Sequence, residues 1–299
     1  MTYKTLIVDS SHLAYRVYFA LPELSFGGKN TQLVYGFFTN LISLVKKQPV
    51  ESIVIVWDSG HTAKSAMYSA YKRKVGDPMS EEQRADFEDQ FKYLNNLLLW
   101  LGLKCCFAEG AEADDVIAHL CNKSVVRAIR PDGSPLPHYI VERPILILSG
   151  DHDLHQLLAE DVAIWKPHRE DIYTIESFEK DFPGVRPSQY REMLALMGCS
   201  GDNVPGVRGI GPKYAYNLIR RYGSVEKIKQ VDASERLVRL AQSCWKDVEL
   251  SYHLVSFVEV DPTMIVQQAN LVKVRRHFFA LGLDSLIESW QSVVKLSEM

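Results

Sequence analysis

Acidic side chains recur where apolar runs of the sequence end. Residues 110–115 read GAEADD and bring three carboxylates within four positions, directly before the apolar stretch VIAHL. Carboxylates this close repel one another, and burial would penalise their charged forms further. Three apolar runs elsewhere in the chain, TLIVD, SIVIVWD and PILILSGDHD, have acids at their ends. The acids at these four places are Asp9, Asp58, Glu112, Asp114, Asp115, Asp151 and Asp153.

A set of carboxylate oxygens is suited to hard cations such as Mg²⁺ or Mn²⁺. Taken one at a time, each Asp could equally be a turn former or a helix cap. The acids of GAEADD could also do no more than stabilise a helix dipole, by about 0.3–1 kcal/mol. Their repetition after several apolar runs favours a metal cluster. We expect structural or supporting roles for His12, His152 and His155.

The apolar runs resemble strands that are covered on both faces, because Ile, Leu and Val follow one another without alternation. Helical patterns lie between them, in SSHLAYRVYFA, in LVYGFFTNLISLVKK and at 81–101. Strands that alternate with helices predict an α/β fold with a central, mainly parallel sheet flanked by helices. Ligands of such a sheet bind outside the carboxyl ends of the strands, so these acids would crowd one edge.

Other parts of the chain give weaker structural signals. A fourth strand is expected at 103–108, and the proline-rich residues 126–144 are expected to form a surface loop. From Pro187 onward the sequence changes to helices and turns, with one long helical pattern at 234–258. We therefore expect an α/β domain at 1–185 and a helical domain at 186–299. The Phe278–Phe279 pair is expected in the core.

A strongly basic segment lies within a chain whose net charge is −3. Residues 204–240 contain eight Lys or Arg and three acids, a net charge of +5, and include GVRGIGPK. Its glycines predict a tight turn before a helix that starts at Pro212. Backbone N–H groups there could hold a DNA phosphate without reading sequence, although a plain corner between two helices is the alternative. The residues concerned are Arg208, Gly209, Ile210, Gly211 and Lys213.

A second basic segment is AKSAMYSAYKRKV at 63–75. It alternates cations with tyrosines, which suits phosphates and unstacked bases, although a solvated basic loop fits equally well. Arg16, which follows Asp9 closely, could clamp a phosphate or form a surface ion pair. The candidate contacts in the segment are Lys64, Tyr71, Lys72, Arg73 and Lys74.

The composition narrows the class of protein. Five cysteines without a CxxC spacing argue against a disulfide framework or a structural zinc site, and favour a reducing cytoplasm. No uncharged apolar run is long enough to span a membrane, and the N-terminus lacks the pattern of a signal peptide. We therefore expect no membrane association.

Together, these motifs resemble the 5′-nuclease superfamily, which comprises flap endonucleases and the 5′→3′ exonuclease domain of bacterial DNA polymerase I. VDSSHLAYRVYFALP, GAEADDVIA, LSGDHDLHQLL, LALMGCSGDNVPGVRGIGPK and ELSYHLVSF occur in the order typical of that family. No polymerase sequence follows, so the chain looks like a free-standing version from a bacterium or a bacteriophage. The resemblance implies a cytoplasmic protein that works as a monomer.

The resemblance also implies roles for individual residues. One site for Mg²⁺ or Mn²⁺ would use Asp9, Asp58, Glu112 and Asp114, with Asp115 alongside. A second would use Asp151, Asp153 and Asp202. Lys72 would contact the scissile phosphate with help from Arg16. A helix-hairpin-helix element, with its turn at 209–211, would hold a K⁺ ion against duplex DNA.

The implied function is that of a structure-specific 5′→3′ exonuclease or flap endonuclease. It would hydrolyse DNA by a two-metal mechanism at 5′ flaps, nicked or branched duplexes and single-stranded 5′ ends. Cys199 stands where the family has a carboxylate, and a thiol is a poor ligand for Mg²⁺. Lys64 and Val75 replace arginines that are usual in the family. Two alternatives are a ribonuclease of the same fold group and a non-catalytic binder of branched DNA with an impaired second metal site.

Overall fold

The computed structural model describes residues 2–73 and 79–299. They form two compact units. Unit 1 consists of residues 1–59, 76–150 and 260–299, and unit 2 of residues 60–75 and 151–259. The division at 185/186 stays a prediction from the sequence, while the structure returns the last part of the chain to the N-terminal unit.

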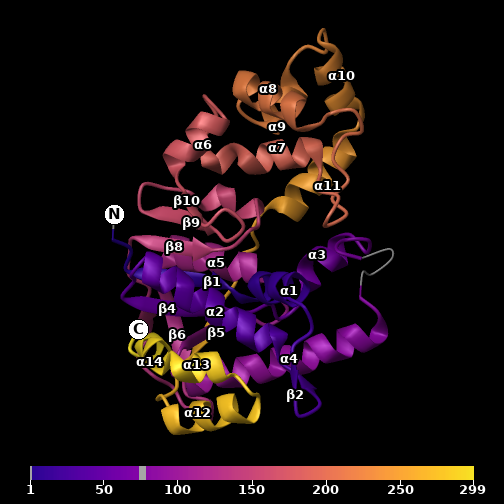
Figure 1. Cartoon of the computed structure of the whole chain (residues 1–299). Helices are drawn as coiled ribbons and strands as arrows, with labels where there is room; N and C mark the ends of the chain where they lie inside the picture. The colour runs from indigo at the N-terminus through magenta and orange to yellow at the C-terminus, as the bar shows by residue number, and fades with distance from the viewer. Residues whose placement is uncertain (1, 74–78) are drawn as a thin grey trace. The chain divides into compact units, whose positions relative to one another are not determined.

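Unit 1 is built around a sheet with the strand order β8-β1-β4-β5-β11-β6-β7 (Figure 1). Strands β8, β1, β4 and β5 are parallel, and β1 is buried along its whole length. Strand β11 runs antiparallel to β5 and parallel to β6, and β7 runs antiparallel to β6. Most pairings in this sheet are thus parallel, as predicted. The strands are β1 (Thr5–Asp9), β4 (Ser52–Val56), β5 (Lys104–Phe107), β6 (Val125–Ile129), β7 (Tyr139–Ile140), β8 (Ile145–Leu148) and β11 (Thr263–Ile265).

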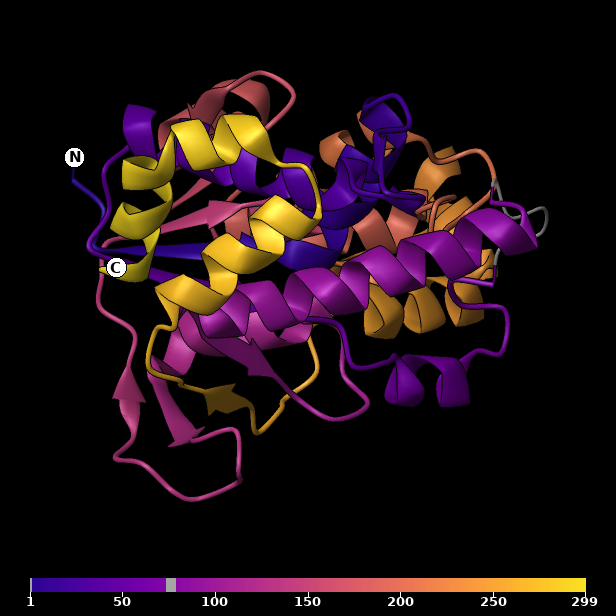
Figure 2. The same cartoon turned by 60° about the horizontal axis from the view of Figure 1, so that its bottom comes forward.

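Helices cover this sheet. A small hairpin of β2 (Ser25–Phe26) and β3 (Lys29–Asn30) lies in the sequence between the first and the second helix. The helices are α1 (Ser10–Ala20), α2 (Gln32–Lys47), α4 (Glu81–Trp100), α5 (Ala113–Lys123), α12 (Leu271–Ala280), α13 (Asp284–Glu288) and α14 (Trp290–Ser297). The long α4 begins at a capping box formed by Ser80 and Gln83. Helix α12 packs on α4, and α13 and α14 pack on α2 (Figure 2).

Unit 2 is mainly helical, with one antiparallel pair of strands, β9 (Val162–Lys166) and β10 (Asp171–Tyr173). Its helices are α3 (Thr62–Met67), α6 (Ile175–Asp181), α7 (Tyr190–Met197), α8 (Pro212–Tyr222), α9 (Val225–Gln230), α10 (Arg236–Ser243) and α11 (Trp245–Val255). Helix α7 packs on α8, α9 and α11. The buried carboxylate of Glu192 in α7 accepts the N–H of Val225 at 3.0 Å, which fixes the start of α9.

Three expectations differ from the structure. The region 126–144 contains β6 and β7 as well as a loop, so the expected surface loop is only partly right. The single helical pattern at 234–258 is divided at Cys244 into α10 and α11. Phe278 is buried, but Phe279 is 54% exposed, so only one of the pair lies in the core. Among the described residues, no helix is long and apolar enough to cross a membrane.

Candidate active site

The acids of unit 1 lie at the carboxyl ends of β1 and β4 and at the start of α5. Asp9 is the last residue of β1 and is only 4% exposed. Its carboxylate accepts hydrogen bonds from Ser149 Oγ at 2.8 Å and from the N–H of His12 at 3.1 Å. Strands β1 and β4 are neighbours, with Asp9 opposite Val56. The side chain of Asp58, two residues further on, therefore belongs to the same edge of the sheet.

Asp58 connects this edge to the GAEADD segment. Its Oδ1 accepts the N–H of Ala113, the first residue of α5, at 2.8 Å. Glu112 is the N-cap residue of α5, and both Glu112 and Asp115 are 3% exposed. Asp114 lies between them and is half-buried. Carboxylates this deeply buried need compensation by hydrogen bonds or by positive charge.

The acids of unit 2 belong to the turn after β8 and to the turn after α7. The N–H of Asp153 donates to Asp151 Oδ1 at 2.8 Å. Burial, together with the carboxylates of Asp151 and Asp202, raises the pKa of Asp153 to about 7, while Lys64 and Lys72 oppose this rise. A carboxyl group in this state is charged only in part at neutral pH. A bound cation would favour its charged form, so these carboxylates are of the chemical type that suits a hard divalent ion.

Residues 70–73 are attached to the loop that carries Asp202. The N–H of Lys72 donates to the Asp202 carbonyl at 2.9 Å. The side-chain amide of Asn203 donates to the carbonyls of Ala70 at 2.9 Å and Arg73 at 2.6 Å. Lys72 (φ 50°) and Asn203 (φ 56°) both have left-handed backbones, so this join has a defined and unusual geometry. No role for Asn203 was expected from the sequence.

The basic segment is more buried than expected. Tyr71 is 5% exposed, so its ring is not free to stack on a base. Instead, the ammonium groups of Lys64 and Lys72 lie 5.8 and 5.6 Å from the centre of that ring. Lys64 is itself buried, whereas Arg73 is exposed. The predicted contact at Lys74 lies outside the described residues.

Cys199 lies among the acids of unit 2. Its backbone pairs with that of Val204, and burial, followed by Asp202 and Asp153, raises the pKa of its thiol. Within the described ranges 2–73 and 79–299, no group of three or more His, Cys, Asp or Glu side chains is arranged so that it could hold a metal ion. The two predicted ligand sets therefore stay predictions.

The expected glycine turn precedes α8. The N–H of Val207 donates to the Leu196 carbonyl at 2.8 Å, so the turn is fastened to the end of α7. Gly209 has a left-handed backbone (φ 98°), and Gly211 is the N-cap residue of α8. The side chain of Ile210 is buried, so only its backbone could meet a ligand. Arg208 and Lys213 are exposed beside the turn.

Arg16 belongs to α1 in unit 1 and is half-buried. It lies two turns after Asp9, the N-cap residue of the same helix. The position is compatible with a role near the acids of that unit, and the clamp predicted from the sequence stays a prediction.

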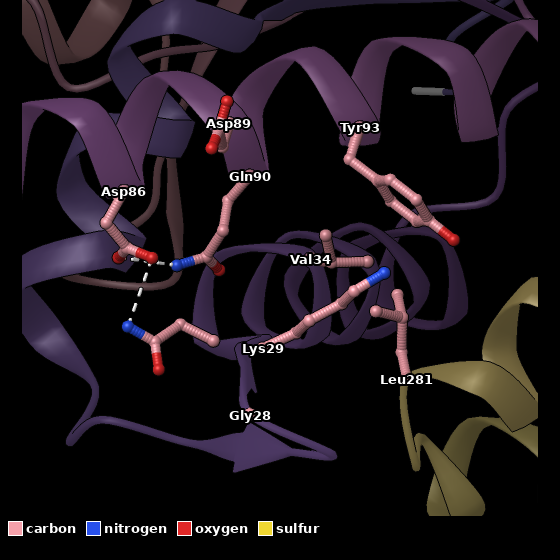
Figure 3. A pocket seen from close by; sticks show the side chains of 9 residues that line it. Gly28, Lys29, Val34, Asp86, Asp89, Gln90, Tyr93 and Leu281 are labelled. Carbon is pink, nitrogen blue, oxygen red and sulfur yellow. Dashed lines mark hydrogen bonds between the residues drawn. The ribbon is translucent and has the colours of Figure 1, made fainter.

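A separate pocket of about 420 Å³ in unit 1 does not involve these acids. Asp86 lies in its wall and is already satisfied, because its carboxylate accepts from Asn30 at 3.0 Å and Gln90 at 2.9 Å (Figure 3). The same carboxylate also accepts from the hydroxyl of Tyr18 at 2.8 Å. The side-chain carbonyl oxygen of Gln90 accepts a hydrogen bond from the N–H of Leu33. These bonds fasten α4 to α1, α2 and the β2–β3 hairpin, which gives the pocket wall a structural role.

Comparisons with known proteins agree with these features. Residues 4–183 match the model of the 5′-3′ exonuclease N-terminal resolvase-like domain, and residues 185–275 match that of the 5′-3′ exonuclease C-terminal SAM fold. The chain is 33% identical over 305 residues to a 5′-3′ exonuclease of Aquifex aeolicus, covering 98% of this chain and 97% of that protein. It is 37% identical over 229 residues to the thermostable DNA polymerase I of Thermus thermophilus, covering 76% of this chain but only 25% of the polymerase.

Solved structures share the fold. The T5 D15 protein co-crystallised with metal ions superposes with a TM-score of 0.66 at 20% identity, over 98% of this chain and 99% of that one. Flap endonuclease-1 of Methanococcus jannaschii superposes with a TM-score of 0.58 at 15% identity, over 99% and 93% of the two chains. The family models and the Aquifex relative show that this chain belongs to the 5′-3′ exonuclease family and is a nuclease.

Proposed function

We propose that this nuclease hydrolyses DNA phosphodiester bonds near 5′ ends, at flaps, nicks and branched duplexes, with Mg²⁺ or Mn²⁺ as cofactor. The observation that carries the proposal is the set of half-buried acids in unit 2, where desolvation of the carboxyl group, followed by the charges of Asp151 and Asp202, raises the pKa of Asp153 to about 7. Such a set is costly without a cation and suited to one. The T5 D15 flap endonuclease has been crystallised with DNA and metal ions, which supports the same chemistry here.

The acids of the two units would hold the metal ions. Asp9, Asp58, Glu112, Asp114 and Asp115 would serve from unit 1, and Asp151, Asp153 and Asp202 from unit 2. Two such ions, when bound, activate water and stabilise the leaving oxygen of a phosphodiester. Ser149 and His12 orient the carboxylate of Asp9, and the N–H of Ala113 orients that of Asp58.

Lys72 would neutralise charge that develops on the scissile phosphate. Its backbone is held by Asp202 and its side chain lies over Tyr71, so its position depends on the same loop as the acids. Lys64 acts on Asp153 in the same direction as Lys72, which limits the repulsion among the acids before any cation binds. Arg16 would assist at the phosphate.

The glycine turn before α8 would hold the backbone of duplex DNA. Backbone N–H groups and the positive end of the helix dipole favour phosphate there, with Arg208 and Lys213 as flanking cations. The carbonyl groups of the turn would hold K⁺. Binding of this kind depends on salt and is largely blind to sequence, and we expect the protein to act as a monomer.

A cleavage assay on a duplex with a labelled 5′ flap tests the proposal. We expect no cleavage in EDTA and cleavage from the 5′ side in Mg²⁺ or Mn²⁺. Intact substrate that is nevertheless bound in both metals would show a non-catalytic binder, which the thiol of Cys199 among the acids favours as the second candidate. Faster cleavage of the matching RNA flap would show a ribonuclease instead.

A further inference from the structure

A lysine with no role in the proposed chemistry is buried beside the acids of unit 2. Lys166 ends β9 and is 4% exposed. Fully buried lysines are rare in proteins unless a partner compensates for their charge. The ammonium group of Lys166 donates to the backbone carbonyl of Asp151 at 3.4 Å and lies 5.6 Å from the centre of the Tyr173 ring.

The ammonium group of Lys166 has partners that suit a positive charge. A carbonyl oxygen at hydrogen-bond distance and the face of an aromatic ring both suit a protonated ammonium group, and the carboxylates of Asp151 and Asp171 also favour its charge. The ring of His155 stacks on that of Tyr173 with 4.6 Å between their centres, so Lys166, Tyr173 and His155 form one wall beside Asp151.

The wall adjoins the turn that would hold a metal ion. The backbone carbonyl of Asp151 accepts a hydrogen bond from the ammonium of Lys166, and its carboxylate accepts one from the N–H of Asp153. A positive charge in so buried a place acts strongly on its neighbours, because little solvent screens it. Without a metal ion it would offset part of the negative charge of Asp151, to which it is coupled directly. With a metal ion present, the two positive charges repel each other.

We propose that Lys166 is a positioning residue that acts as a built-in counter-cation of the Asp151–Asp153 turn and thereby limits the affinity of this turn for divalent cations. The inference rests on the proposed function, in which Asp151 and Asp153 bind metal. It assigns to Lys166 two linked effects. The ammonium stabilises the metal-free turn, and it raises the concentration of cation that the nuclease needs.

Binding of Mn²⁺ to the whole protein, without DNA and followed by electron paramagnetic resonance, tests this assignment. Lys166→Met removes the charge and keeps a side chain of similar length among apolar neighbours. We expect Lys166→Met to bind Mn²⁺ roughly tenfold more tightly than the wild type. Lys166→Arg, which keeps the charge, should not gain affinity. Lys180→Met removes an exposed charge from α6 of the same unit and should match the wild type.

Thermal unfolding gives a second readout that a merely structural role would not change in this way. The metal-free Lys166→Met protein should melt at a lower temperature than the wild type, yet gain more from added Mn²⁺. If Lys166→Met fails to fold, Lys166→Gln repeats both measurements with a polar replacement. Equal or weaker Mn²⁺ binding in the neutral variant overturns the inference and leaves the proposed function standing. A wild type that binds no Mn²⁺ overturns both.

Discussion

The side-chain amide of Asn203 donates a hydrogen bond of 2.6 Å to the backbone carbonyl of Arg73, which is 130 positions away in the sequence. A second bond from the same amide reaches Ala70 at 2.9 Å. The N–H of Lys72 meets the carbonyl of Asp202 between them. The segment that carries Lys72 is thus hydrogen-bonded directly to the loop that carries Asp202. A substitution in that loop should therefore change the position of Lys72.

Replacement of Asn203 should therefore lower activity through Lys72. Asn203→Gly keeps the left-handed backbone (φ 56°) and removes both side-chain bonds, whereas Asn203→Ala also strains the backbone. We expect Asn203→Gly to lower kcat for flap cleavage by roughly tenfold to a hundredfold and Asn203→Ala to unfold more easily by a further 1 kcal/mol or so. Steady-state kinetics and urea unfolding measure the two effects. A wild-type kcat in Asn203→Gly would show that the join is only structural.

Much of the fold and part of the site could be predicted from local patterns. The apolar runs that end at Asp9 and Asp58 are strands β1 and β4, or continue directly from them, and GAEADD does open a helix. These features are local, since burial on both faces and the start of a helix leave their mark on neighbouring residues.

The remaining features depend on pairing between distant segments. Strand β11 has three residues, too few for a pattern, and exists because it lies between β5 and β6. It is followed by the C-terminal helices, which belong to unit 1 although they come last in the chain. Asn203 could have been noticed only as a residue that tolerates a left-handed backbone. The burial of Lys166 leaves no trace in a sequence where lysine normally marks the surface.

The raised pKa of Asp153 predicts how stability depends on pH. The folded, metal-free protein binds a proton at about pH 7, whereas the unfolded chain binds it only near the ordinary value of 3.8. Between these values the folded state holds more protons, so metal-free stability should fall as the pH rises from 4 to 7. Urea unfolding in EDTA at pH 5 and pH 8 measures the fall. Asp153→Asn should remove most of it, and an equal fall in that variant would contradict the assignment.

Cys199→Asp should strengthen metal binding in unit 2. The new carboxylate would lie beside Asp202 and Asp153, where it adds a hard oxygen ligand and also more repulsion. We expect the metal-free variant to be less stable than the wild type, and its half-saturating Mg²⁺ concentration to fall by roughly tenfold. Calorimetric titration with Mg²⁺ measures the second effect. Cys199→Ser controls for size without charge, and identical Mg²⁺ dependence in all three proteins would rule out a metal role for this position.

Gly211→Ser separates DNA binding from stability at the turn before α8. Gly211 is the N-cap residue of α8, and an added Cβ there would meet no atom within 4 Å. Serine is a favoured N-cap, so the free energy of unfolding should be unchanged or slightly higher. Its hydroxyl would, however, occupy the backbone N–H groups that a phosphate needs. We expect duplex affinity, measured by anisotropy in EDTA, to fall by roughly tenfold. Wild-type affinity in Gly211→Ser would mean that the duplex is held elsewhere.

Lys213→Ala should instead lower the slope of log affinity for the duplex against log salt concentration by about one.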